Sequence, residues 1–209
     1  MSGGLIYCFG DSHTFLLSEQ PGFKVVGGGA HLAHSFRYED HPVKVDIERI
    51  LLEIPEQSNL MFMYGEIDCR MHIPKQFHTK VRTMEEAALG SVEGYVAALI
   101  GYAHRGHSVL LWGPHVMSKK WYLKGVDADP ETRCGVTGTW KEIQRATMLF
   151  NRYAKEKCEG TPVKFATFYD LMVKRQIYSD TRWYQDYNHL NRECLPMIYK
   201  VMKEAGFPL

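Results

Sequence analysis

Five short apolar runs, separated by segments with helical spacing, restrict the fold of this chain more than any other feature. Each run is too short to be a buried helix, and four of them are followed at once by glycine. The third run is apolar almost throughout, a pattern typical of a strand covered on both faces. Strands that alternate with helices predict an α/β fold, a three-layer sandwich around a five-stranded parallel sheet. The runs span residues 5–9, 23–26, 59–64, 108–112 and 163–168.

Local signals place the helices between these runs. Two segments, Thr83–Glu86 and Thr139–Glu142, have the Ser/Thr-x-x-Glu pattern of a capping box, and each is followed by apolar residues at helical spacing. Further helices are expected from Pro42 onward and near the end of the chain, over residues 195–202. Since the sequence contains no repeat, low-complexity tract or linker, we expect a single domain over residues 1–209.

Composition restricts the possible partners and the compartment. The chain is 45% hydrophobic and 23% charged with a net charge of +1, so no overall field favours nucleic acid or an anionic membrane surface. No apolar stretch approaches the ~20 residues of a membrane span. The five cysteines are odd in number and lack the Cys-x-x-Cys spacing, which is typical of reduced thiols. We therefore expect a cytoplasmic protein with no nucleic-acid or membrane partner; the oligomeric state is not predicted.

Two short segments at opposite ends of the chain carry the residues of an acyl-transfer site. The hexapeptide Phe9–Thr14 ends the first apolar run with glycine, an acid and a hydroxyl, which turns the chain off a sheet and presents Ser12 at the start of a helix. Near the C-terminus, Asp186 and His189 stand three residues apart. A serine, a histidine and an aspartate are the components of a Ser-His-Asp catalytic triad.

The Gly-Asp-Ser-His segment that ends at His13, followed much later by Asp186–Asn191, resembles the SGNH hydrolase superfamily, also called GDSL-type esterases and lipases. The order and spacing of these blocks cover nearly the whole chain. The resemblance implies a flavodoxin-like SGNH hydrolase fold and an enzyme that needs no cofactor. It also implies that Ser12 is the nucleophile, that His189 is the general base and then acid, and that Asp186 holds the imidazole.

The same resemblance implies an oxyanion hole built from backbone N–H groups. One is that of Ser12, which lies at a helix N-terminus. The other comes from a glycine of the second block, for which the triplet Gly27–Gly29 is the candidate, and Gly28 is favoured.

The third block departs from the family pattern Gly-x-Asn-Asp. Here Ile67 stands in the position of the asparagine and cannot donate a hydrogen bond. Loss of one oxyanion donor typically costs ~2.7–4 kcal/mol of transition-state stabilisation. Arg70 is the nearest strong donor and is expected to complete the oxyanion hole, although an ion pair with Glu66 or Asp68 is equally compatible with its position.

Several other residues follow the ends of predicted strands, where open α/β sheets bind their ligands. We expect these residues to contact substrate: Asp11, His13, Gly65, Glu66 and Asp68. Carboxylates and histidines at these positions raise metal-assisted hydrolysis as an alternative, but no His-Glu-x-x-His or similar ligand spacing exists, so no metal site is predicted. Residues 115–137 lack clear periodicity and are expected to form an irregular lid or binding loop.

Together these features predict a serine-dependent esterase that hydrolyses a small acyl ester through an acyl-enzyme on Ser12. The segment Gly65–Arg70 resembles a divergent branch of the superfamily found beside glycan and capsule functions, so O-acetyl groups on a carbohydrate are the preferred substrate. An acyltransferase would use the same acyl-enzyme. A catalytically weak binding module is the alternative from another class, and Ile67 is the argument for it.

Overall fold

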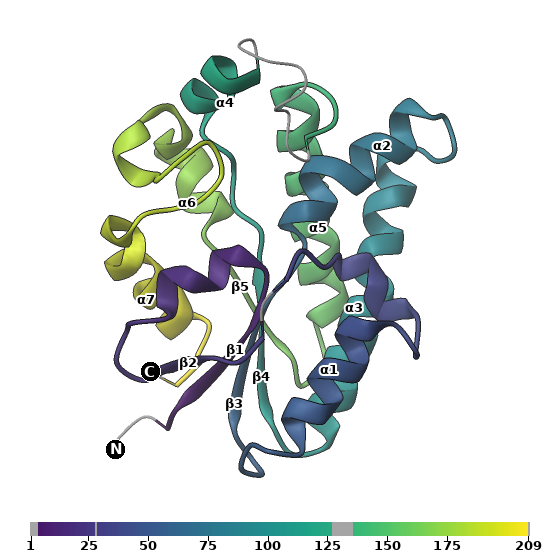
Figure 1. Ribbon diagram of the computed structural model, residues 1–209, viewed down its shortest axis with the longest axis vertical. Helices are drawn as coiled ribbons and strands as arrows, with labels where there is room; N and C mark the ends of the chain where they lie inside the picture. Colours follow the sequence, from purple (N-terminus) through teal and green to yellow (C-terminus); the bar gives the residue numbers. More distant parts are fainter. Residues whose placement is uncertain (1–3, 28, 127–135, 209) are drawn as a thin grey trace.

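The computed structural model describes residues 4–27, 29–126 and 136–208 and contains a five-stranded parallel sheet (Figure 1). The strand order is β2-β1-β3-β4-β5, and every neighbouring pair is parallel. This confirms the predicted α/β class and the five strands. The strands are β1 (Ile6–Gly10), β2 (Phe23–Val25), β3 (Asn59–Met63), β4 (Ser108–Gly113) and β5 (Lys164–Thr167).

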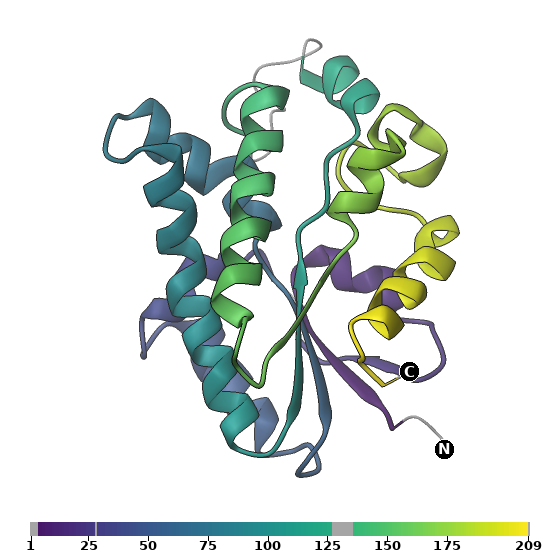
Figure 2. The ribbon, with the colours of Figure 1, turned by 180° about the vertical axis from the view of Figure 1, so that it is seen from behind.

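Helices cover both faces of the sheet, as Figures 1 and 2 show. One face carries α1 (Pro42–Leu51), α3 (Met84–His104) and α5 (Trp140–Cys158). The other carries the 3-10 helix η1 (Ser12–Leu17), α6 (Tyr169–Lys174) and α7 (Leu195–Glu204). Near the carboxyl ends of the strands lie α2 (Ile73–His78) and α4 (Lys119–Val126). Single turns of 3-10 or π-helix complete the described elements: Ala33–Arg37, Asp68–His72, Ile177–Ser179, Thr181–Trp183 and Arg192–Cys194.

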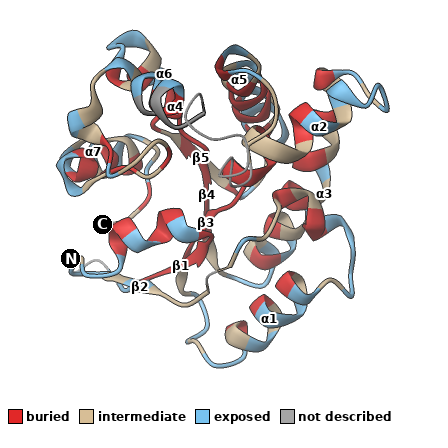
Figure 3. Ribbon diagram, turned by 45° about the horizontal axis from the view of Figure 1, so that its top comes forward, coloured by how far each residue is buried: buried red, intermediate tan, exposed pale blue. Residues whose placement is uncertain are grey.

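The two sides of the sheet have separate apolar cores because side chains alternate along each strand. Phe62 of β3 points to the α3 side, where its ring stacks between Phe9 and Tyr102 at centroid distances of 4.9 and 5.5 Å. Its neighbours Met61 and Met63 point to the α7 side. Figure 3 shows the buried residues gathered along the sheet and on the inner faces of the helices. The strand predicted to be covered on both faces is therefore covered on both.

The predicted helix starts at residues 83 and 139 are confirmed as complete capping boxes. The Thr83 and Thr139 hydroxyls each accept the backbone N–H of the glutamate three residues on, whose carboxylate accepts the N–H of the threonine. The expectation of an irregular segment over residues 115–137 is wrong for residues 119–126, which form α4. Residues 127–135 lie outside the described part of the chain. No helix in the described part is both long and apolar enough to span a membrane.

Tight turns follow β1 and β3 and bring their ends together. Gly65 has φ +116°, and a Cβ there would lie 2.4 Å from the Phe150 ring of α5. A Cβ at Gly10 would lie 2.8 Å from the carbonyl oxygen of Met63. Only glycine fits such a conformation and such close approaches. As a result, the chain leaving β3 passes next to the residues that follow β1.

Candidate active site

Three side chains from the two ends of the sequence form one hydrogen-bonded row at the carboxyl end of the sheet. Ser12 Oγ lies 2.7 Å from His189 Nε2, and His189 Nδ1 lies 2.7 Å from Asp186 Oδ2. The other oxygen of Asp186 accepts the backbone N–H groups of Asn188 and His189 at 2.7 and 2.8 Å. The Asp186 carboxylate thus holds the backbone of residues 186–189 through one oxygen. Its other oxygen orients the His189 imidazole, which faces Ser12.

The turn after β1 presents the Ser12 side chain to solvent. Asp11 is the N-cap of η1: its backbone is extended, and its side chain accepts the His13 N–H at 3.0 Å. Its carbonyl oxygen accepts both the backbone N–H and the hydroxyl of Thr14. Ser12 is therefore the first residue of a helix whose start is fixed by three hydrogen bonds, and it is exposed while its neighbours on both sides are buried.

The charge on Asp186 completes the row. Partial burial would raise the pKa of Asp186, but the two backbone N–H groups and the His189 ring outweigh it and lower that pKa. The carboxylate is ionised at neutral pH, so it accepts a hydrogen bond from His189 Nδ1–H. Nε2 is then free to accept the Ser12 hydroxyl proton, as a general base must.

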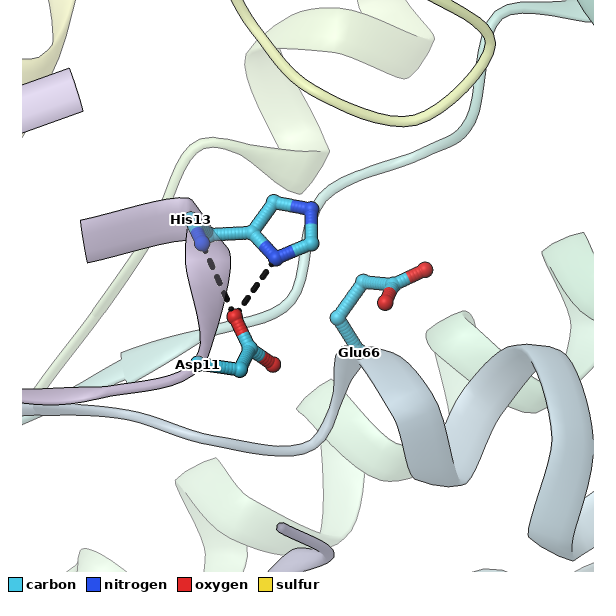
Figure 4. Close-up of side chains that lie close together, drawn as sticks. All are labelled: Asp11, His13 and Glu66. Carbon is cyan, nitrogen blue, oxygen red and sulfur yellow. Dashed lines mark hydrogen bonds and ion pairs between the residues drawn. The ribbon is translucent and has the colours of Figure 1, made fainter. Parts of the chain in front are cut away.

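A second Asp–His pair, Asp11 and His13, packs against the first (Figure 4 shows the second pair). Asp11 Oδ1 lies 2.6 Å from His13 Nδ1, and both side chains are buried. The His13 ring stacks on the His189 ring at 4.8 Å, with an interplanar angle of 27°. The His115 ring contacts His13 edge-on at 4.9 Å. Three imidazoles from distant segments therefore pack beside Ser12.

The buried imidazoles carry different charges. Burial disfavours the charged form of His13, but the Asp11 carboxylate outweighs burial and raises the pKa of His13 to about 9. Burial and the charge on His13 together lower the pKa of His115 to about 3, and its Nε2 lies 2.7 Å from the carbonyl oxygen of Asn188. At neutral pH His13 is an imidazolium and His115 is neutral.

Ser12 opens onto a pocket of about 250 Å³. The polar part of the wall includes His13, His189 and Gln185. Phe15 stands at the pocket with 60% of its surface exposed. The apolar lining is Phe15, Leu16, Met63, Trp112, Leu190 and Ile198. An apolar wall beside a nucleophile suits the acyl group of an ester.

Glu66, in the turn after β3, lies next to the Asp11–His13 pair (Figure 4). It is buried, and its Oε2 accepts the Arg70 Nε–H at 2.8 Å. This is one of the two ion pairs that the sequence allowed for Arg70. Arg70 does not line the pocket at Ser12 among the described residues, and its role as an oxyanion donor stays a prediction.

The other residues of the third block serve the fold around the site. Asp68 is fully buried, and its carboxylate accepts the backbone N–H groups of Ala33 and His34 at 2.6 and 3.1 Å. Burial raises the pKa of Asp68 to about 6. Ile67 is also buried and offers only an apolar side chain. Gly28, the favoured glycine donor, lies outside the described residues.

Several pocket residues were not predicted as site residues, namely Phe15, Trp112, His115, Gln185 and Arg192. His115 and Trp112 flank the Gly-Pro pair that ends β4, and that strand end was the available signal. Gln185 is next to Asp186, but its exposure to the pocket depends on the loop conformation. Phe15 shows no signal in the sequence, because an exposed phenylalanine is read as ordinary surface.

One group of side chains in the described residues has the composition of a metal site: Asp11, His13 and Glu66, with ligand atoms within 4.8 Å of one another. These side chains already form ion pairs. Asp11 binds the protonated His13, and Glu66 binds Arg70. A cation would have to displace a proton and compete with a guanidinium, so the donor set fits a metal poorly.

Neither a family model nor a curated protein matches the sequence. Solved structures, in contrast, match it over nearly the whole length. A catalytic mutant of the acetylxylan esterase Axe2 from Geobacillus stearothermophilus has a TM-score of 0.59 at 13% identity, covering 99% of this chain and 97% of its own. A protein described as an SGNH hydrolase from Slackia heliotrinireducens has a TM-score of 0.57 at 12% identity, covering 98% and 99%. A protein described as a GDSL-like lipase from Parabacteroides merdae has a TM-score of 0.57 at 13% identity, covering 97% and 95%. The chain has the SGNH hydrolase fold.

Proposed function

We propose that this protein is a serine-dependent esterase that hydrolyses a small acyl ester. The observation that carries the proposal is the row Ser12–His189–Asp186, with both contacts at 2.7 Å and the nucleophile exposed to a pocket. The fold supports it, because solved structures described as SGNH or GDSL hydrolases share it over nearly their whole length. A binding module without turnover would have no need of this geometry.

The reaction follows from the positions of these three side chains. Ser12 Oγ attacks the ester carbonyl carbon while its proton moves to His189 Nε2, and Asp186 stabilises the imidazolium that forms. The tetrahedral intermediate expels the alcohol, which takes its proton from His189, and leaves an acyl group on Ser12. Water then gives a proton to His189 and attacks the acyl-enzyme. The acid is released and Ser12 regains its proton.

For the substrate, we propose an O-acetyl group on a carbohydrate. The support is the acetylxylan esterase among the structures with this fold, together with a pocket whose volume suits a short acyl chain. Transfer to an alcohol other than water would use the same acyl-enzyme. Incubation with acetylated xylo-oligosaccharide separates the two, because hydrolysis releases free acetate and transfer yields an acetylated acceptor.

A fluorophosphonate probe tests the nucleophile. We expect one adduct on the wild-type protein, assigned to Ser12 by peptide mass spectrometry, and none on Ser12→Ala. Ser18, an exposed serine at the end of the same helix, is the matched control, so Ser18→Ala should be labelled like wild type. With p-nitrophenyl acetate, Ser12→Ala should lose at least ~10³-fold in kcat. An unchanged rate, or an adduct at another residue, would disprove the assignment.

A further inference from the structure

Three buried polar atoms without a hydrogen-bond partner belong to one cluster of side chains, two of which come from the residues on either side of Ser12. They are Asp11 Oδ2, His13 Nε2 and Glu66 Oε1, in side chains of residues that are 1%, 8% and 5% exposed. A buried polar atom without a partner costs ~1–3 kcal/mol, and native proteins retain few of them. Such atoms next to a nucleophile therefore call for an explanation through function.

His13 is held in place on every side. Asp11 accepts hydrogen bonds from both its ring Nδ1 and its backbone N–H, at 2.6 and 3.0 Å. The rings of His189 and His115 pack against its face and edge at 4.8 and 4.9 Å. The side chain directly follows Ser12 in the chain and lines the same pocket. Its free nitrogen therefore has a fixed direction before any substrate binds.

The charges around His13 decide what its free nitrogen can do. Because Asp11 keeps the ring protonated, Nε2 carries a proton and is a donor. Glu66 and Arg70 form a neighbouring pair of opposite charges, and His115 is neutral. His13 is thus a buried cationic donor in the wall of the pocket.

The third block lacks a donor at the position where the family pattern has asparagine, since Ile67 is buried and apolar. We propose that the His13 imidazolium, clamped by Asp11, stabilises the oxyanion that forms when Ser12 attacks the ester. The proposal rests on the proposed esterase function and assigns to His13 the work of the missing asparagine side chain.

The energetic logic is that of a preorganised donor. In the free protein Nε2 has no acceptor among the described residues, so its interaction strengthens as negative charge develops on the substrate oxygen. Shielding from bulk water increases the strength of that interaction. The loss of such a donor lowers kcat by about 10²–10³-fold and leaves KM nearly unchanged.

Two substitutions separate this role from simple packing. His13→Gln keeps an N–H donor and loses the ring, whereas His13→Phe keeps a ring against His189 and loses the donor and the charge. We expect kcat for p-nitrophenyl acetate to fall by about 10²–10³-fold in His13→Phe and clearly less in His13→Gln. Affinity for a boronic acid that mimics the tetrahedral intermediate should fall in the same order. The matched controls His107→Phe and His107→Gln, at the opposite end of β4, should retain wild-type kcat.

The result that overturns the proposal is equal kcat in the two variants, or the reverse order, because either would assign His13 to ring packing. Thermal melts of both variants show whether they fold. If His13→Phe does not fold, Asp11→Asn replaces it, since it removes the charge partner that keeps His13 protonated; because a neutral ring keeps one N–H donor, kcat and boronic-acid affinity should fall by about as much as in His13→Gln, and an unchanged kcat would overturn the proposal.

Two further measurements distinguish the proposed role of His13 from a metal site and from a failure of the esterase proposal. Dialysis against EDTA should leave wild-type activity unchanged; a loss that Zn²⁺ or Mn²⁺ restores would make the cluster a metal site and overturn the proposal. Fluorophosphonate labelling of Ser12 separates this inference from the proposed function. If wild type is not labelled, the esterase proposal fails, whereas normal labelling with full kcat in His13→Phe disproves the role of His13 alone.

Discussion

Two Asp–His pairs flank Ser12, and they differ mainly in burial. In the first, His189 and Asp186 have side chains that are 32% and 43% exposed, and the imidazole contacts the nucleophile. In the second, the side chains of His13 and Asp11 are 7% and 2% exposed, and the imidazole contacts only its own carboxylate by hydrogen bond among the described residues. The N–O distances of the pairs, 2.7 and 2.6 Å, are nearly the same.

This difference in burial gives the two Asp–His pairs different functions. An exposed imidazole can exchange its proton with a substrate that enters the pocket. A buried imidazole beside an ionised carboxylate holds its second proton more tightly when the attraction to that carboxylate outweighs burial, as it does for His13. The first pair is suited to moving protons, and the second to holding a fixed charge.

The largest expected effect falls on the exposed pair. Asp186→Asn leaves the size of the side chain unchanged but removes the charge that selects the His189 tautomer, so kcat should fall by about 10³–10⁴-fold. The urea midpoint should change little, because Asp186 is half-exposed. Steady-state kinetics and urea unfolding on one preparation measure both quantities. A large loss of stability with intact kcat would reverse the roles assigned to the two pairs.

The next effect concerns the stability that the buried pair provides. Asp11→Asn leaves His13 buried without its counter-charge and should lower the free energy of unfolding by about 3–5 kcal/mol. Asp180→Asn is the matched control, since Asp180 forms an exposed ion pair with Arg182 whose loss should cost less than about 1 kcal/mol. Equal effects in the two variants would show that burial does not distinguish the pairs.

A smaller effect appears as pH dependence. The pKa of His13 is raised from 6.5 to about 9 by Asp11, so its contribution to stability is fully present below pH 6.5 and is lost as the pH rises through 9. The loss is on the order of 3 kcal/mol. The charged or titratable groups that face His13 are Asp11, Glu66, Arg70, His115 and His189.

Urea unfolding of wild type and Asp11→Asn from pH 6 to pH 10 isolates this contribution. Groups common to both proteins cancel in the difference, which should shrink steadily as the pH rises above 6.5. A difference that stays constant over this range would mean that His13 is not protonated in the folded protein.

The smallest effect is expected at the pocket surface. Arg192 lines the pocket and forms an exposed ion pair with Glu19. Arg192→Ala should therefore change stability by less than about 1 kcal/mol, and KM for p-nitrophenyl acetate by less than about fivefold. A larger change in KM would place a charged substrate group beside Arg192, outside both Asp–His pairs.

Local patterns were sufficient for much of the fold. The apolar runs located all five strands because strand burial leaves a direct mark on composition, and the Ser/Thr-x-x-Glu pattern located two helix starts because capping involves neighbours in the chain. The helix α4 was missed, since it is short and carries a glycine, Gly125, within a segment that lacks clear periodicity. Phe15 and Gln185 lie next to predicted site residues in the sequence, but their exposure to the pocket depends on the local backbone conformation and left no pattern to read.

By itself, the sequence determined the parallel α/β architecture and singled out Ser12, Asp186 and His189 as candidates, because strand periodicity and motif spacing are properties of the chain alone. It also marked Ile67 as the departure from the family pattern. Only the tertiary structure decided what surrounds that departure. The burial of the Asp11–His13 pair and its stacking on His189 depend on segments that meet across the end of the sheet, whereas the Asp11–His13 and Glu66–Arg70 contacts join near neighbours in the chain. Burial and charge at a site are sums over such neighbours, and no local pattern contains them.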